Sequence, residues 1–150
     1  MSYSIQLVRR KSRSKIKKVS SSDLPIGGTY CVPNGDTITE QDLFFNITYN
    51  FAWYLYKTID EDLGVRWIYG KKGKDVIERL GQAKAKCEEM AEEEAKNKCI
   101  LSETWGAGEP YDEGRIHHDY WYPCAKHAAD AISGLIFLAA IAPDFTFDGD

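Results

Sequence analysis

Three histidines and a cysteine are the residues of this chain best able to bind a metal. They are His117, His118, Cys124 and His127. Cys124 and His127 stand three positions apart, so a helix would place them on one face, and imidazole with thiolate suits zinc. Adjacent histidines point apart, however, and the spacing of the four residues matches no standard zinc site. We therefore predict no metal and no other cofactor, and interpret these side chains as residues at the start of a helix.

A lysine-rich loop could bind an anion. Gly70-Lys71-Lys72-Gly73-Lys74 directly precedes a predicted helix, and the free N–H groups of a helix N-terminus together with ammonium groups can hold a phosphate. The GxxxxGK[ST] pattern of a Walker A loop is absent. The alternatives are an anion site at Lys71, Lys72, Gly73 and Lys74 and an ordinary exposed turn.

Aromatic residues are concentrated between Tyr49 and Tyr56, in the sequence Tyr-Asn-Phe-Ala-Trp-Tyr-Leu-Tyr. One helical face cannot bury every ring, because neighbouring side chains point in different directions. Some rings must therefore meet another element, a partner or a ligand. We favour core packing plus a homodimer contact, and a ligand pocket in which Tyr49 and Trp53 stand near the lysine loop is the alternative.

Catalytic motifs are missing from the sequence. Neither GxSxG nor HExxH occurs. Carboxylate pairs could come from Asp112, Glu113, Asp119, Asp144, Asp148 and Asp150, but acids as common as these are usually solvated. We expect a non-enzymatic protein, although catalytic groups can converge in space from distant parts of a sequence.

Two helices are indicated by apolar periodicity, and a third by the aromatic run. One begins near Gly73 or Lys74, and a charged segment, about residues 88–119, extends it and forms a loop. In this helix Val76, Leu80, Ala83, Cys87 and Met90 recur at helical spacing. Another runs from about Cys124 to Ala142, where Pro143 stops it. The third begins near Asn50.

Strands are indicated by alternation and by β-prone residues. We predict a basic hairpin over about residues 3–20, whose second strand is Lys15–Val19, and strands at Thr29–Val32, Leu43–Tyr49 and Phe145–Phe147. Gly64–Tyr69 is predicted to be a short buried turn or strand. The fold class that follows is α+β: one domain, residues 1–150, with a small, mostly antiparallel sheet and about three helices packed on one face.

Charge is divided unevenly along the 150 residues. Seven basic residues and no acid fall within residues 1–22, so the rest of the chain carries a net charge of −11. We interpret the basic stretch as a hairpin whose lysines protect a sheet edge. Because the acidic body repels phosphate, direct nucleic-acid binding is not expected.

Localisation is predicted from what the sequence lacks. The start of the chain has no apolar segment of the signal-peptide kind, and the longest apolar run, Gly134–Pro143, is too short to span a bilayer. The four cysteines form no CxxC pair, which favours reduced thiols in a cytosol.

Five short motifs occur in order along the chain, and they are Gly27–Tyr30, Asn46–Asn50, Gly64–Gly70, Asp119–Trp121 and Phe147–Asp150. Together they resemble the motifs of a family of small bacteriophage and prophage proteins. The chain departs from that pattern between Cys87 and Gly114, and at Lys71, Lys72, Cys124 and His127. The resemblance implies a phage origin and a setting in the host cytoplasm. It implies no activity and no site residues.

Our leading hypothesis is a non-enzymatic phage protein that binds a host protein. Its acidic surface would imitate nucleic acid and inhibit a host defence or nucleic-acid enzyme. The residues expected to make the contact are Glu88, Glu89, Glu92, Glu93 and Glu94. The alternative is a protein that binds or sequesters a nucleotide-like anion at Gly70–Lys74.

Overall fold

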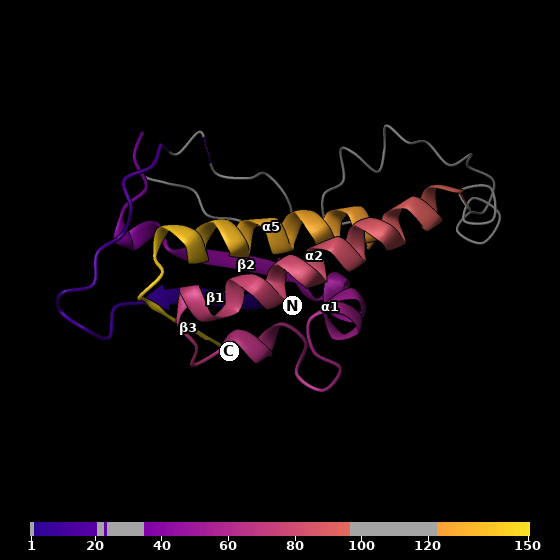
Figure 1. Ribbon diagram of the computed structural model, residues 1–150, viewed down its shortest axis with the longest axis horizontal. Coiled ribbons are helices and arrows are strands. Elements are labelled where there is room, and N and C mark those ends of the chain that lie inside the picture. Colours follow the sequence, from indigo (N-terminus) through magenta and orange to yellow (C-terminus); the bar gives the residue numbers. More distant parts are fainter. Residues whose placement is uncertain (1, 21–22, 24–34, 97–122) are drawn as a thin grey trace.

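Three strands form the sheet in the part of the chain that the computed structural model describes, residues 2–20, 23, 35–96 and 123–150 (Figure 1). The strands are β1 (Ser2–Val8), β2 (Phe44–Thr48) and β3 (Thr146–Gly149). β1 lies in the middle and pairs antiparallel with both neighbours, with Ile5 opposite Phe45 on one side and Gly149 on the other. The predicted α+β class with an antiparallel sheet is confirmed.

One face of the sheet is apolar and the other is mostly polar, apart from Phe44 and Val8, because successive side chains of a strand point to opposite faces. Tyr3, Ile5 and Leu7 of β1 are at most 4% exposed, whereas Gln6 is exposed. β2 and β3 follow the same rule, with Phe45, Ile47 and Phe147 buried. Other elements of the fold must therefore pack on the apolar face to bury it.

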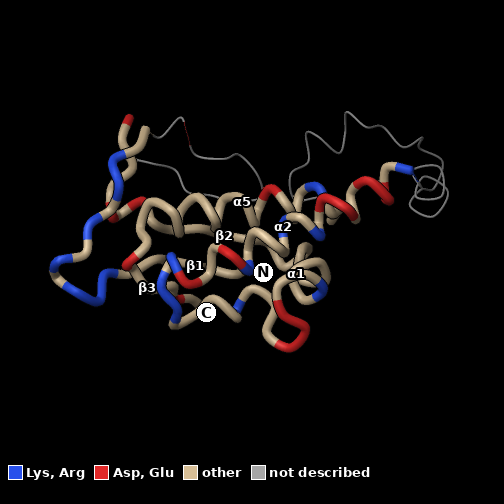
Figure 2. Tube along the Cα trace, viewed as in Figure 1, with Lys and Arg blue, Asp and Glu red and all other residues tan. Residues whose placement is uncertain are grey.

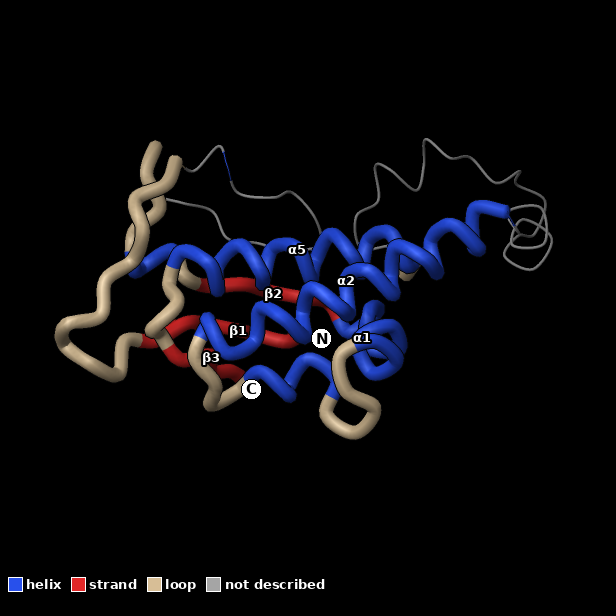
Figure 3. The backbone as a smooth tube through the Cα atoms, in the orientation of Figure 1, coloured by secondary structure: helices blue, strands red, loops and turns tan. Residues whose placement is uncertain are grey.

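Two long helices cover that face, α2 (Gly73–Lys96) and α5 (Ala125–Ile141). They lie side by side above the sheet, as Figure 3 shows. The predicted spacing along α2 is confirmed, since its buried side chains include Val76, Leu80 and Cys87. In α5, Gly134 lies against Phe45 so closely that a Cβ atom would stand 2.2 Å from the phenyl ring. The buried apolar side chains of sheet and helices form one cluster.

Shorter helical segments complete the described structure. They are η2 (Glu40–Asp42), η3 (Tyr49–Phe51), α1 (Ala52–Thr58) and η4 (Gly64–Ile68). η3 and α1 confirm the helix expected from about Asn50. η4 shows that the predicted turn or strand at Gly64–Tyr69 is a 3-10 helix, which begins at Gly64 with a φ of 57°.

The predicted N-terminal hairpin over residues 3–20 is wrong. Both edges of β1 are used by β2 and β3, and Lys15–Val19 forms no strand. This segment instead runs past the end of α5, where the Lys17 N–H donates to the Ile141 carbonyl at 2.7 Å. Ile16 and Val19 pack against the core, so the apolar residues of the alternation are partly buried without pairing to β1.

Two other predictions lie outside the described residues. One is the strand at Thr29–Val32. The other is the part of the charged extension and loop from 97 to 119, although 88–96 belongs to α2.

Candidate functional site

The C-terminal part of α2 carries acidic side chains on its exposed side, while Met90 and Ala91 on the other side still pack against the core. Cys87 is the last buried residue of the helix as described, and Glu88, Glu89, Glu92 and Glu93 are all exposed. At about 100° per residue these four side chains occupy an arc of about 140° on one side of the helix. We call them the acidic end of α2. Figure 2 shows this acidic segment at the far end of the helix from the sheet strand β3.

Glu94 was predicted to belong to this surface, but in the structure its carboxylate is hydrogen-bonded to residues of the protein. Its Oε1 accepts a hydrogen bond from the Tyr54 hydroxyl at 2.5 Å, and its Oε2 accepts one from the Ala125 N–H at 2.9 Å. The carboxylate thus joins α1, α2 and the first turn of α5, where a negative charge is favoured by the helix dipole. Burial, reinforced by the Glu94 carboxylate, raises the pKa of Tyr54. Glu94 is therefore a residue of the interior contact.

The other acids differ in their partners. Glu88 pairs with Lys84 one turn earlier, with 3.4 Å between Nζ and Oε1. Glu89, Glu92 and Glu93 form no ion pair within the described ranges. Among the described residues, these three carboxylates are the part of the acidic end that has no ion-pair partner.

The backbone of the lysine loop, Gly70–Lys74, is hydrogen-bonded to β3 and to the residues just before it. Gly70 N–H donates to the Phe147 carbonyl at 2.8 Å, and Phe147 N–H donates to the Lys71 carbonyl at 2.9 Å. The first amides of α2 are also used, since Gly73 N–H donates to Phe145 and Lys74 N–H donates to Pro143. The amides that an anion would need already have partners, and the loop closes the outer edge of β3. The anion site stays a prediction.

The lysines of that loop also diverge. Lys71 Nζ donates to the Trp67 carbonyl at 2.6 Å and lies 4.4 Å from the centre of the Trp67 ring. Lys74 pairs with Asp144 at 3.1 Å, and Lys72 bridges to Thr146 through its backbone. The ammonium groups of Lys71 and Lys74 therefore have separate partners.

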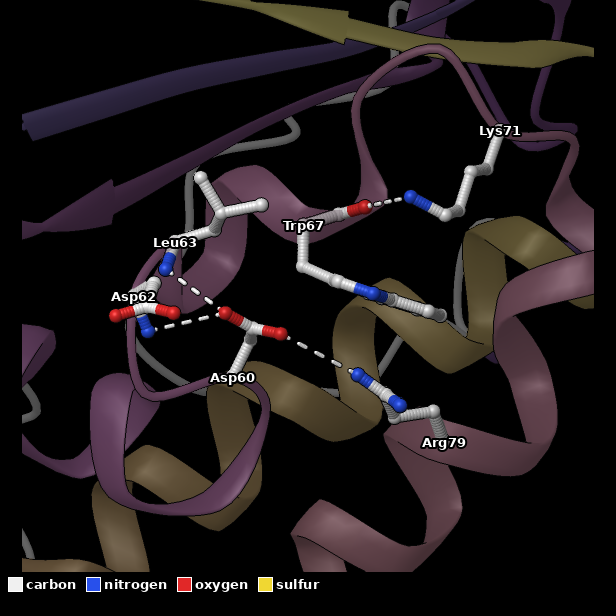
Figure 4. A network of polar contacts seen from close by, with 6 residues as sticks. All are labelled: Asp60, Asp62, Leu63, Trp67, Lys71 and Arg79. Carbon is white, nitrogen blue, oxygen red and sulfur yellow. Dashed lines mark hydrogen bonds and ion pairs between the residues drawn. The ribbon is translucent and has the colours of Figure 1, made fainter.

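Trp67 is held between two cations, which Figure 4 shows from close by. Lys71 lies on one side, and the Arg79 guanidinium lies on the other at 4.3 Å from the ring centre. Arg79 also donates to Asp60 at 3.4 Å. The backbone N–H groups of Leu63 and Asp62 donate to the same carboxylate and lower the pKa of Asp60. Sequence reasoning missed this network, which fixes the loop between α1 and η4.

The aromatic run divides between core and surface. Phe51, Tyr54 and Leu55 are buried, whereas Trp53 is 57% exposed with the Lys57 ammonium 5.8 Å from its ring centre. Tyr49 packs edge-on against Tyr3, with ring centres 4.5 Å apart. Tyr49 and Trp53 therefore contact different neighbours, and neither contact involves the lysines at 71–74.

A second cluster joins residues from distant parts of the chain. The Arg66 guanidinium lies 5.1 Å from the centre of the Tyr3 ring, and Arg66 and Tyr69 both donate to the Asp150 carbonyl at 3.3 Å. Asp150 Oδ1 accepts from the Ser4 N–H at 2.9 Å. Burial raises the pKa of Tyr69 to about 12. No sequence pattern signals this cluster, since its members come from separate segments. It holds η4 against the sheet.

Of the residues weighed as metal ligands, Cys124 and His127 are described, and His117 and His118 lie outside the described residues. Cys124 is the N-cap of α5, and both it and His127 are buried. In the described part of the chain, no group of three or more His, Cys, Asp or Glu side chains could hold a metal ion. Burial raises the pKa of the Cys87 and Cys124 thiols, so neither is favoured as a thiolate. Among the described helices, none is both long and apolar enough to cross a membrane.

Comparison of the chain with protein-family models, with curated proteins and with solved structures returned no match. The functional argument therefore starts from the geometry of the described side chains.

Proposed function

We propose that this chain is a non-enzymatic binding protein that uses the acidic end of α2 to contact a basic surface on another protein. The observation that carries the proposal is the position of Glu89, Glu92 and Glu93. They are exposed on one side of a helix that extends past the last residue it buries, and no described cation neutralises them. Acidic side chains arranged in this way attract a basic surface and can occupy the place of a nucleic-acid backbone.

The setting that we propose is a bacterial host infected by a phage. The support is the resemblance of five ordered motifs, among them Asn46–Asn50 and Gly64–Gly70, to small phage and prophage proteins. In that setting the partner is a host protein whose own ligand is nucleic acid, such as a defence nuclease, and the protein inhibits it in the host cytoplasm.

The test is charge reversal on the helix. The triple variant Glu89→Lys, Glu92→Lys, Glu93→Lys should lose the host protein that the unmodified chain captures, because three carboxylates of the contact are replaced by cations. Capture should also weaken as salt rises, since exposed charges are screened within about 8 Å at physiological ionic strength. The captured protein is identified by mass spectrometry, and its nuclease activity is measured with and without the chain.

A matched control distinguishes an effect of this surface from an effect of net charge alone. Glu61, Asp62 and Glu78 are exposed acids elsewhere, and their reversal to lysine changes the net charge by the same amount. The control variant should retain capture and inhibition. Equal loss of capture in both variants, or equal retention, would contradict the proposed surface.

A further inference from the structure

The segment that follows β1 is a basic loop, which we define as residues 9–18. It contains Arg9, Arg10, Lys11, Arg13, Lys15, Lys17 and Lys18 and no acidic residue. All seven basic side chains are exposed. Figure 2 shows the loop as the continuous basic segment at one end of the molecule. The sequence interpretation, lysines that guard a hairpin edge, does not apply because the hairpin is not formed.

The backbone of the loop is held in place at several points. The Ser14 N–H donates to the Lys11 carbonyl at 3.1 Å, and the Ser14 residue is only 7% exposed. The Lys17 N–H caps α5 at Ile141, and the Val19 carbonyl accepts from the Ile38 N–H at 3.2 Å. A loop that is ordered before binding loses less entropy when a partner binds.

Few of these charges are neutralised by residues that the structure describes. Arg9 pairs with Glu40, and Arg10 lies 3.9 Å from Asp148. The other five cations form no ion pair with any residue that the structure describes, and they are Lys11, Arg13, Lys15, Lys17 and Lys18. The described residues therefore leave five exposed cations of the loop unpaired.

The acidic end of α2 is too distant to neutralise the loop. The loop contacts the last turn of α5 at Ile141, and α2 begins at the same end, since Gly73 lies against Ala139 and Ala142. From Gly73 to Glu92 the helix rises by about 28 Å. This distance is several times the screening length of about 8 Å in physiological salt. The carboxylates of the acidic end therefore do not prevent an anion from binding at the basic loop.

We propose that the basic loop binds the phosphate backbone of double-stranded nucleic acid without reading its sequence. A duplex presents one phosphate per about 1.7 Å of its axis, which lets one short loop contact several phosphates. The loop contains no aromatic side chain on which unpaired bases could stack, so a duplex is favoured over a single strand. A lipid surface is disfavoured because Ile16, the loop's apolar residue, packs inward against the core and leaves nothing to insert into a membrane.

The experiment measures the anisotropy of a fluorescent random-sequence duplex as the protein is added, at several salt concentrations. With five phosphates neutralised, the logarithm of the association constant should fall with the logarithm of salt at a slope of about −4.5. Affinity should then drop by roughly 10²- to 10³-fold between about 50 and about 200 mM salt. The variant Lys11→Gln, Arg13→Gln, Lys15→Gln should reduce the magnitude of the slope by about 2.7.

The matched control is Lys57→Gln, Lys86→Gln, Lys126→Gln, which removes three exposed cations from α1, α2 and α5. Its salt slope should equal that of the unmodified protein, and thermal melts should show that both variants fold. A duplex affinity that is equal in the two variants would overturn the proposal. So would binding to phosphatidylserine vesicles in the absence of duplex binding. Head-to-tail association of the protein alone, detected by sedimentation and lost in the loop variant while the duplex does not bind, would overturn it as well.

Discussion

The Tyr54 hydroxyl donates to Glu94 at 2.5 Å, and through this contact the short helix α1 is joined to α2 near the point where α2 leaves the core. The second Glu94 oxygen accepts from Ala125, so the same carboxylate also holds the start of α5. One side chain therefore fixes the relative position of three helices that are separate in sequence.

Removal of this carboxylate should destabilise the fold. Glu94→Ala should lower the free energy of unfolding by about 2 kcal/mol, because a hydrogen bond to a charged group contributes roughly 1.5–3 kcal/mol. Chemical denaturation followed by circular dichroism measures the change. The neighbouring Glu93→Ala, on the exposed side of α2, should stay within about 0.5 kcal/mol of the unmodified protein. If Tyr54→Phe costs as much in the Glu94→Ala background as alone, the two residues are not coupled.

Substitution by alanine should change the stability of the protein in opposite directions at two helical glycines. Gly134→Ala should destabilise the protein by about 1–3 kcal/mol, because the added Cβ atom would lie 2.2 Å from the Phe45 ring and overlap it. Gly81→Ala in α2 should stabilise it by up to about 1 kcal/mol, because nothing lies within 4 Å and alanine is the better helix former. Denaturation midpoints of the two variants decide the comparison. A neutral Gly134→Ala would mean that α5 does not pack on Phe45 as described.

Stability should decline in alkali partly because of Tyr69. Burial raises its pKa to about 12 from an ordinary value of 10.0, so the folded protein holds the phenolic proton where the unfolded chain releases it. The stability that this proton contributes is complete below pH 10 and is lost as pH rises toward about 12. Urea midpoints should therefore fall less steeply above pH 10 for Tyr69→Phe than for the unmodified protein. The same slope in both would contradict the role given to this tyrosine.

Inorganic phosphate and nucleotides should not bind at the lysine loop, so no rise in the melting temperature should depend on its lysines. The amides of Gly70, Gly73 and Lys74 already donate to β3 and its flanking residues, and Lys71 is bound to Trp67. Thermal-shift measurements test this expectation. A rise in melting temperature that disappears in Lys71→Ala, Lys72→Ala but persists in Lys84→Ala, Lys86→Ala would instead support the anion site predicted from the sequence.

The helices could be predicted because their signals are local. Val76, Leu80, Ala83 and Cys87 recur at the helical period and are the side chains that α2 buries. Pro143 marks the end of α5 in the same way, alternation locates β1, and apolar, β-prone residues locate β2. The acids of residues 88–93 could likewise be placed on an exposed surface, because Cys87, Met90 and Ala91 continue the apolar side of the helix and leave the glutamates on the other side.

Strand partners and side-chain roles could not be predicted in this way. Alternation at Lys15–Val19 is equally consistent with a strand and with a loop that packs two apolar residues, and pairing of β1 with β3 decided between them. Glu94 looks like its neighbours in sequence but faces Tyr54, forty residues earlier. Arg66, Tyr3 and Asp150 meet only because η4 lies against the sheet.

The sequence by itself determined where the two long helices lie, which of their faces are apolar and that positive charge precedes negative charge along the chain. These properties depend on residue type and on neighbours within one or two turns. The tertiary structure decided where the two charges lie. Because α2 and α5 run side by side and the basic loop is fixed to the last turn of α5, the cations and the acidic end of α2 lie at opposite ends of the helix pair. Contacts between residues far apart in sequence produce that separation, and no local pattern specifies such contacts.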